Sequence, residues 1–181
     1  MNTRLPITFV SLLLGLVAGV ASASAEAPDA GSPPVVPNAG FEEGLANWSP
    51  GRTSSHMSQV IPEAAHSGTM GLRMTDSGPG EAGSLTSGAI PLGAAKRVTV
   101  GFWGRLVSGK GAAVTLVFLD EAGAEIKMEK TPQIGVYHAG GKNYSTSVDV
   151  PAGATQMLLR LRTWSPAEVT ADFDDFTVTL N

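Results

Sequence analysis

The stretch RVTVGFWGRLV, residues 97–107, alternates between apolar and other side chains with a period of two. The apolar set consists of Val98, Val100 and Phe102. Successive side chains of a β-strand point to opposite faces, so Trp103 and Arg105 share the other face. We therefore expect a half-buried strand here, with Trp103 and Arg105 on the side away from the core.

Further short runs of this kind follow at regular spacing and are separated by turn residues. They span residues 70–75, 84–92, 97–107, 112–120, 144–150, 156–162 and 171–180. Beyond Pro37 no stretch keeps a helical apolar period across three turns. The pattern predicts an all-β sandwich or barrel, with hairpin turns at 108–111 and 120–123.

Two of these strands carry charged residues whose direction matters. In 156–162 the alternation places Arg160 and Arg162 away from the core. In the last strand, two steps back from apolar Phe176 place Asp174 on the core face. A carboxylate there is costly unless it is paired or bound to a metal ion.

The composition limits the function classes. The chain has 181 residues, enough for one domain, and its 43% hydrophobic content can supply a core. It has no cysteine, which excludes disulfide scaffolds, thiolate metal sites and cysteine nucleophiles. With 12 basic and 16 acidic residues, the chain has no basic surplus for nucleic acid or an anionic membrane.

The N-terminal segment has the pattern of an export signal. Arg4 precedes an apolar run from Leu5 to Val20, and small residues with two overlapping Ala-x-Ala frames follow. We expect residues 1–25 to be a signal peptide, the mature chain to have no membrane span, and the protein to be secreted or periplasmic. Residues 26–36 are rich in proline and predict a linker, so the folded domain should be 37–181.

Four segments in order resemble the carbohydrate-binding modules of the family 4/9/22 type. They are PNAGFEEGLANW at 37–48, AHSGTMGLRM at 65–74, the strand at 98–105, and FDDFTV at 173–178. This resemblance implies a jelly-roll β-sandwich of two antiparallel sheets, similar to galactose-binding domains. It also implies a non-catalytic module that binds a polysaccharide or oligosaccharide.

The resemblance further implies a structural calcium ion that joins the two ends of the domain. The implied ligands are Glu42, Asp174 and carbonyls around Ser67 to Thr69, with Glu43 and Asp175 as the alternative carboxylates. Carboxylate and carbonyl oxygens are the ligands that Ca²⁺ prefers. The alternative is that Asp174 caps a turn or pairs with Arg73.

Catalytic patterns are weak. The histidines are far apart, and no G-x-S-x-G elbow occurs. The neighbouring pairs Glu42–Glu43 and Asp174–Asp175 would point to opposite faces of a strand, so neither could flank one glycosidic bond. We expect no enzyme activity.

Aromatic rings and arginines are the residue types that bind sugars, through stacking and planar hydrogen bonding. The candidate ligand-binding residues are Trp103, Arg105, Arg160, Arg162, Trp164 and Tyr137. If their strands are neighbours, Trp103 and the arginines form one patch; otherwise a loop covers Trp103 and the arginines are solvated. Trp48 is expected in the core. The alternative function is an extracellular or surface module that keeps this fold and binds a protein partner.

Overall fold

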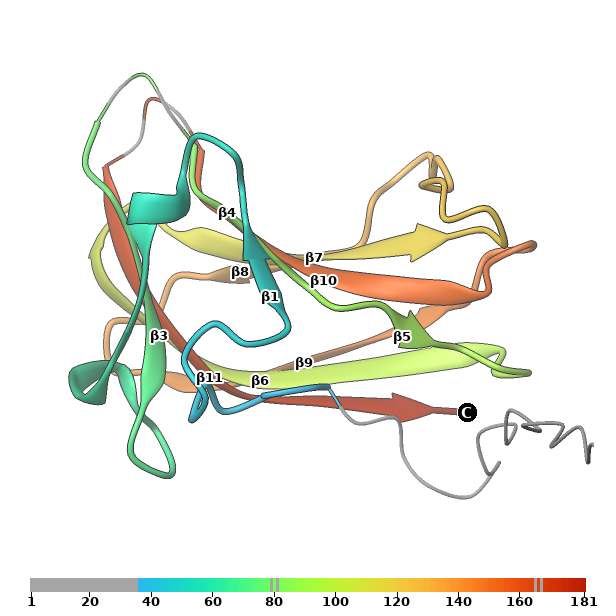
Figure 1. The fold of residues 1–181 in the computed structure, drawn as a ribbon, viewed down its shortest axis with the longest axis horizontal. Helices are drawn as coiled ribbons and strands as arrows, with labels where there is room; N and C mark the ends of the chain where they lie inside the picture. Colours follow the sequence, from blue (N-terminus) through green and yellow to red (C-terminus); the bar gives the residue numbers. More distant parts are fainter. Residues whose placement is uncertain (1–35, 79, 81, 165, 167) are drawn as a thin grey trace, which may run out of the picture.

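The computed structural model describes residues 36–181 except 79, 81, 165 and 167, and shows an all-β sandwich (Figure 1). The expected signal peptide at 1–25 and all of the proline-rich linker before residue 36 lie outside the described residues. The prediction of two antiparallel sheets is confirmed. Within the described part of the chain, no helical segment has the length and hydropathy of a membrane span.

Sheet A has the strand order β1-β4-β10-β7-β8, with the short β5 also paired to β10. Its strands are β1 (Trp48–Pro50), β4 (Ser84–Ser87), β5 (Ile90–Pro91), β7 (Ala112–Leu119), β8 (Gln133–Val136) and β10 (Gln156–Arg162). All its strand pairs are antiparallel. Apart from β7 and β8, strands that are adjacent in this sheet are not consecutive in the chain.

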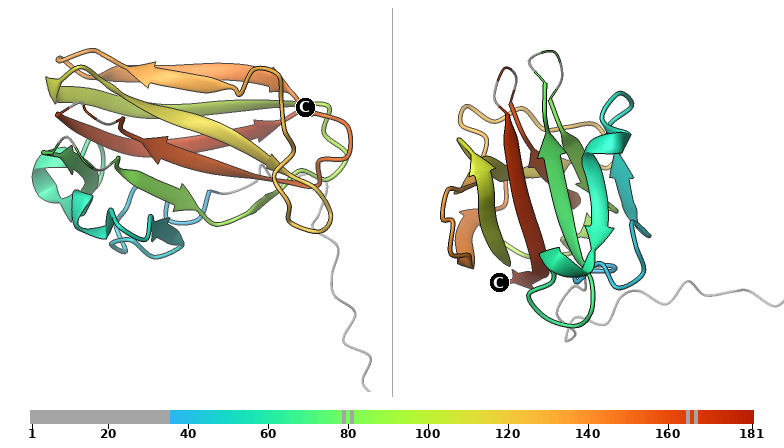
Figure 2. Two further views of the ribbon diagram at one scale, coloured as in Figure 1. Left: turned by 90° about the horizontal axis from the view of Figure 1, so that it is seen from above. Right: turned by 90° about the vertical axis from the view of Figure 1, so that its left-hand side faces the viewer.

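Sheet B has the strand order β2-β3-β11-β6-β9, which the right-hand view of Figure 2 shows side by side. Its strands are β2 (Ser58–Ile61), β3 (Gly71–Asp76), β6 (Arg97–Gly109), β9 (Lys142–Asp149) and β11 (Val169–Leu180). Two 3₁₀ turns, η1 (Ser55–Met57) and η2 (Pro62–Ala64), flank β2. The first and last long strands, β3 and β11, are hydrogen-bonded neighbours, which brings the two ends of the domain together.

The core lies between the sheets and follows the predicted alternation. The strand at 97–107 contributes Val98, Val100 and Phe102, all nearly inaccessible to solvent. At one edge the rings of Phe41, Trp48 and Phe176 form a cluster, with centroids 5.0 to 6.1 Å apart. The expected core position of Trp48 is confirmed, since 4% of the residue is exposed.

Some local expectations were wrong. Strands β1, β2 and β8 were not predicted, and the run at 84–92 divides into β4 and β5. The segment at 108–111 is not a hairpin turn, because β6 belongs to sheet B and β7 to sheet A. It is a crossover between sheets, which Gly109 and Gly111 permit with φ angles of 89° and 125°. The turn at 120–123 does reverse the chain, closed by the Gly123 amide donating to the Asp120 carbonyl.

The expected direction of Asp174 was also wrong, although the residue is fully buried. The β6–β11 register shifts between Asp174 and Thr177, and Asp175 has a φ of 53°. This bulge lets Phe173 and Phe176, three positions apart, both reach the core. Asp174 pairs with Trp103 across the strands and therefore shares its outward face. A covering loop, rather than the core, buries this carboxylate.

Candidate functional site

The six candidate binding residues lie on two opposite outer faces. Trp103 and Arg105 are on β6 in sheet B, whereas Arg160 and Arg162 are on β10 in sheet A. The two strands are not neighbours, so the single patch of Trp103 with these arginines does not form. Each face has to be judged separately.

The outer face of sheet B is closed over Trp103. The His66 ring stacks on the indole at a centroid distance of 4.8 Å, and Gly141 packs so closely against the ring that a Cβ there would clash. Only 9% of Trp103 is exposed. The indole is directed away from the core as expected, but it is not open, because the loops that carry His66 and Gly141 cover it.

Arg105 is likewise occupied. Its guanidinium bonds the Asp172 carboxylate, with Nε–Oδ2 at 3.0 Å, and donates to the Glu63 carbonyl at 2.7 Å. Arg73 bonds the same fully buried carboxylate at 2.7 and 2.9 Å, and this contact raises the pKa of Arg73. Charge-assisted bonds of this kind hold both arginines in place. Arg105 therefore has a structural partner on a closed face.

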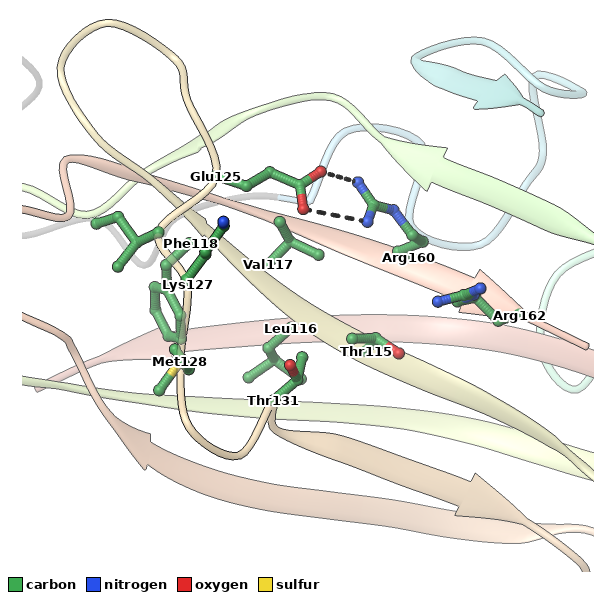
Figure 3. A pocket seen from close by; sticks show the side chains of 11 residues that line it. Thr115, Leu116, Val117, Phe118, Glu125, Lys127, Met128, Thr131, Arg160 and Arg162 are labelled. Carbon is green, nitrogen blue, oxygen red and sulfur yellow. Dashed lines mark hydrogen bonds and ion pairs between the residues drawn. The ribbon is translucent and has the colours of Figure 1, made fainter. Parts of the chain in front are cut away.

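The outer face of sheet A is hollowed along β7. The strand register places Arg160, Thr115 and Gln133 in one row, and Arg162, Ala113 and Gly135 in the next. Small side chains thus form the middle, while the arginines stand on one side and the segment 125–131 on the other. We call this surface the trough; it includes a hollow of about 370 Å³ (Figure 3), within the range of about 300–1,000 Å³ typical of ligand sites.

An ion pair crosses the trough. The Arg160 Nη2 and Glu125 Oε1 atoms are 2.5 Å apart, and Figure 3 shows the two side chains facing each other above Val117. The hydrogen bond from Arg160 lowers the pKa of Glu125, and the charges of Arg160 and Arg162 add to this effect. Glu125 is therefore ionised at neutral pH, and the pair ties the 125–131 segment to β10.

Two aromatic side chains stand near one end of the trough. Tyr137 follows β8, and its ring lies against Gly111 and Gly135, where any side chain would clash with it. The residue is nevertheless 63% exposed. Trp164 is 36% exposed and lies two residues beyond Arg162, with the buried Thr163 between them. Alternation continued from Arg162 directs the Trp164 indole to the same face as the arginines.

The expected metal-ligand residues meet at the loop formed by residues 66–70. Glu42 accepts hydrogen bonds from the Thr69 hydroxyl and from the Thr69 and Met70 amides, at 2.6 to 3.2 Å. These bonds, led by that of the hydroxyl, lower the pKa of Glu42. The loop thus connects the opening segment of the domain to β3.

Asp174 contacts the same loop from β11. Its Oδ2 accepts the His66 and Ser67 amides at 2.7 and 3.1 Å, and its Oδ1 accepts the Asp175 amide at 2.8 Å. Burial nevertheless raises the pKa of Asp174. Among the described residues no lysine or arginine is paired with this carboxylate, and Arg73 bonds Asp172 instead.

Four residues that line the hollow were not predicted as site residues: Thr115, Val117, Glu125 and Lys127. Alternation within 112–119 does direct Thr115 and Val117 outward. Their contact with Arg160 depends on the pairing of β7 with β10, for which a single sequence offers no signal. The position of Glu125 depends on the irregular course of residues 120–132.

Comparison with known proteins gives a consistent result. The model of a family described as a carbohydrate binding domain matches residues 34–169. No curated protein matches the chain. The resemblance expected from the four segments is therefore confirmed.

Solved structures with the same fold include three binding modules. A family 16 carbohydrate-binding module is 16% identical, with a TM-score of 0.62, over 80% of this chain and 98% of that one. TmCBM61, solved with β-1,4-galactotriose, is 21% identical, with a TM-score of 0.55, over 83% and 100%. The CBM22-1 xylan-binding domain of Paenibacillus barcinonensis Xyn10C is 18% identical, with a TM-score of 0.52, over 78% and 90%. At these identities the similarity shows a shared fold.

Proposed function

Since this chain belongs to the carbohydrate-binding domain family, we propose that it binds oligosaccharides or polysaccharides in the trough of sheet A. One observation favours the outer face of sheet A over that of sheet B. The trough is open and hollowed, with Tyr137 exposed beside it, whereas Trp103 on sheet B is covered. TmCBM61 was solved with galactotriose and the CBM22-1 module is a xylan-binding domain, which supports a glycan ligand here.

The trough offers the two contacts that sugars need. The exposed faces of Tyr137 and Trp164 can stack on the C–H face of a sugar ring. Arg162 and the Thr115 hydroxyl can bond the sugar hydroxyls on the floor between them. A hollowed surface also favours a glycan chain over the flat apolar contact typical of a protein partner.

We propose binding without catalysis. Glu125 is the one carboxylate among the described residues that line the hollow, and it is paired with Arg160. Glycoside hydrolysis generally requires two carboxyl groups on either side of the scissile bond. This arrangement therefore supports recognition rather than cleavage.

A glycan-array screen of the purified chain, followed by calorimetry on the positive glycans, tests the proposed function. We expect saturable binding with no release of reducing ends during incubation. A chain that is folded by circular dichroism and binds no glycan on the array would contradict the proposal. Export is part of the proposal and rests on the signal-peptide pattern; an exported protein that begins at Met1 would refute it.

We further propose a calcium ion at the loop formed by residues 66–70. Glu42 and Asp174 both face this loop, and Asp174 is a buried carboxylate without a cationic side-chain partner among the described residues. This chemistry fits a hard cation. The described residues contain no cluster of three acidic or histidine side chains, so carbonyl oxygens and water would complete the shell.

Calcium is expected to raise the melting temperature, and more so at pH 7 than in acid. Burial raises the pKa of Asp174 above its usual value of 3.8 in the folded state, so ionisation of this group removes stability as the pH rises from the unfolded pKa through the folded one. A cation that binds the carboxylate offsets this loss. Asp174→Asn should abolish the calcium effect, whereas Asp149→Asn, at an exposed ion pair with Arg97, should retain it. An equal melting temperature in calcium and in chelator at pH 7 would contradict the proposed calcium site.

A further inference from the structure

The charged residues that line the hollow of the trough are unbalanced. They are Lys127, Arg160 and Arg162 against a single Glu125. The whole chain has a formal charge of −4, so a local surplus of two positive charges runs against the overall balance. The trough is therefore a positive region on an acidic protein.

The surplus resides in two of the three cations. Arg160 is neutralised by Glu125 at 2.5 Å. For Arg162 and Lys127 no ion pair or hydrogen bond is recorded within the described part of the chain, and both are exposed. Figure 3 shows Arg162 on the same face as Arg160, beside Thr115, and its charge contributes to lowering the pKa of Glu125. The Arg162 guanidinium thus contributes positive charge to the hollow, and its N–H donors are free to bind a ligand.

We propose that the trough selects acidic glycans, whose carboxylate or sulfate group is bound by Arg162 with support from Lys127. A guanidinium presents a planar pair of N–H donors that matches two oxygens of such a group, and a charge-assisted bond is about twice as strong as a neutral one. A neutral sugar would leave both cations uncompensated. This inference rests on the proposed function and specifies its ligand class.

Tyr137 and Arg162 are placed to contact different parts of one sugar. Arg162 is in the row with Ala113 and Gly135, whose side chains are too small to stand between its head group and Tyr137. Tyr137 packs on Gly135 at the far side of that row. A sugar ring stacked on Tyr137 can therefore extend its charged substituent across the small residues towards Arg162.

The test uses matched glycan pairs in which one member carries the acidic group and the other has it esterified or removed. Calorimetry would compare α-1,4-tetragalacturonate with its methyl ester, and a sulfated galactan tetrasaccharide with its desulfated form. We expect at least one acidic member to bind about tenfold more tightly than its neutral partner at low ionic strength. In about 1 M salt, where the Debye length is about 3 Å, the preference should shrink severalfold. The pair that shows the preference identifies carboxylate or sulfate as the anion.

Two variants with the same charge change locate the effect. Arg162→Gln should reduce the acidic-to-neutral affinity ratio to about one. Arg97→Gln, at an exposed ion pair on sheet B, should leave the ratio unchanged. Circular dichroism checks that both variants are folded.

The outcomes separate this inference from the proposed function. If array glycans bind in the trough but neither acidic member is preferred, the acidic class is wrong and the proposed function stands. If an acidic glycan is preferred and Arg162→Gln keeps the full preference, the anion is bound elsewhere and the inference is overturned. If no glycan of any kind binds, both fail.

Discussion

Replacing Tyr137 and Trp164 together by alanine is expected to reduce glycan affinity about a thousandfold. Truncating one aromatic residue at the centre of a binding site costs about 2 kcal/mol, or roughly thirtyfold in affinity. Tyr137 and Trp164 are 63% and 36% exposed at the same end of the trough, so each can contribute a stacking contact. Calorimetry with the tightest-binding oligosaccharide of the array measures the loss for the single and double variants.

Trp103→Phe is the matched aromatic control on the other sheet. Trp103 is covered by His66 and Gly141, so the conservative change should leave glycan affinity within about twofold. The single and double alanine variants of Tyr137 and Trp164 should keep the melting temperature close to that of the parent, because the removed side chains are exposed. If Tyr137→Ala with Trp164→Ala binds as tightly as the parent, the trough is not the site.

Trp48→Ala is expected to destabilise the domain by about 3–5 kcal/mol. Trp48 packs against Phe41 and Phe176 at 5.0 and 5.3 Å, and its indole N–H donates to the Asn38 carbonyl at 3.2 Å. Truncation would leave a cavity in this aromatic cluster, and the Asn38 carbonyl would keep the Phe41 amide as its donor. Because the free energy of unfolding of domains of this size is about 5–15 kcal/mol, the variant should lose a large share of it.

Urea denaturation of the parent and the variant measures this effect. Trp164→Ala removes the same side chain from an exposed position and should cost less than about 1 kcal/mol. A Trp48→Ala variant with the urea midpoint of the parent would contradict the assigned core. The comparison separates the tryptophan that stabilises the fold from the one assigned to binding.

Alternation in single strands predicted much of the fold. In β6 and β10 the expected core residues are buried, because a period of two follows directly from strand geometry. The short strands β1 and β8 were missed, since three or four residues are too few to show a period. The crossover at 108–111 was mistaken for a hairpin because the same glycines suit both.

The binding surface was less predictable, for two physical reasons. Alternation shows which side of its strand Arg160 occupies, but the strand order decides that Thr115, rather than Trp103, is its neighbour. Outward direction also does not mean exposure, since His66, 37 positions before Trp103 in the sequence, covers that indole. At Asp174 a bulge shifts the alternation, and the residue is buried by a loop instead of by the core.

Chemical-shift mapping of the isotope-labelled chain with the tightest-binding oligosaccharide tests the choice of face most directly. We predict that the amides of Ala113, Thr115 and Gly135 shift progressively and saturate with the ligand. The indole N–H of Trp103 should stay in place. Saturable shifts centred on Trp103 and His66, with the amides of the trough unmoved, would contradict the account.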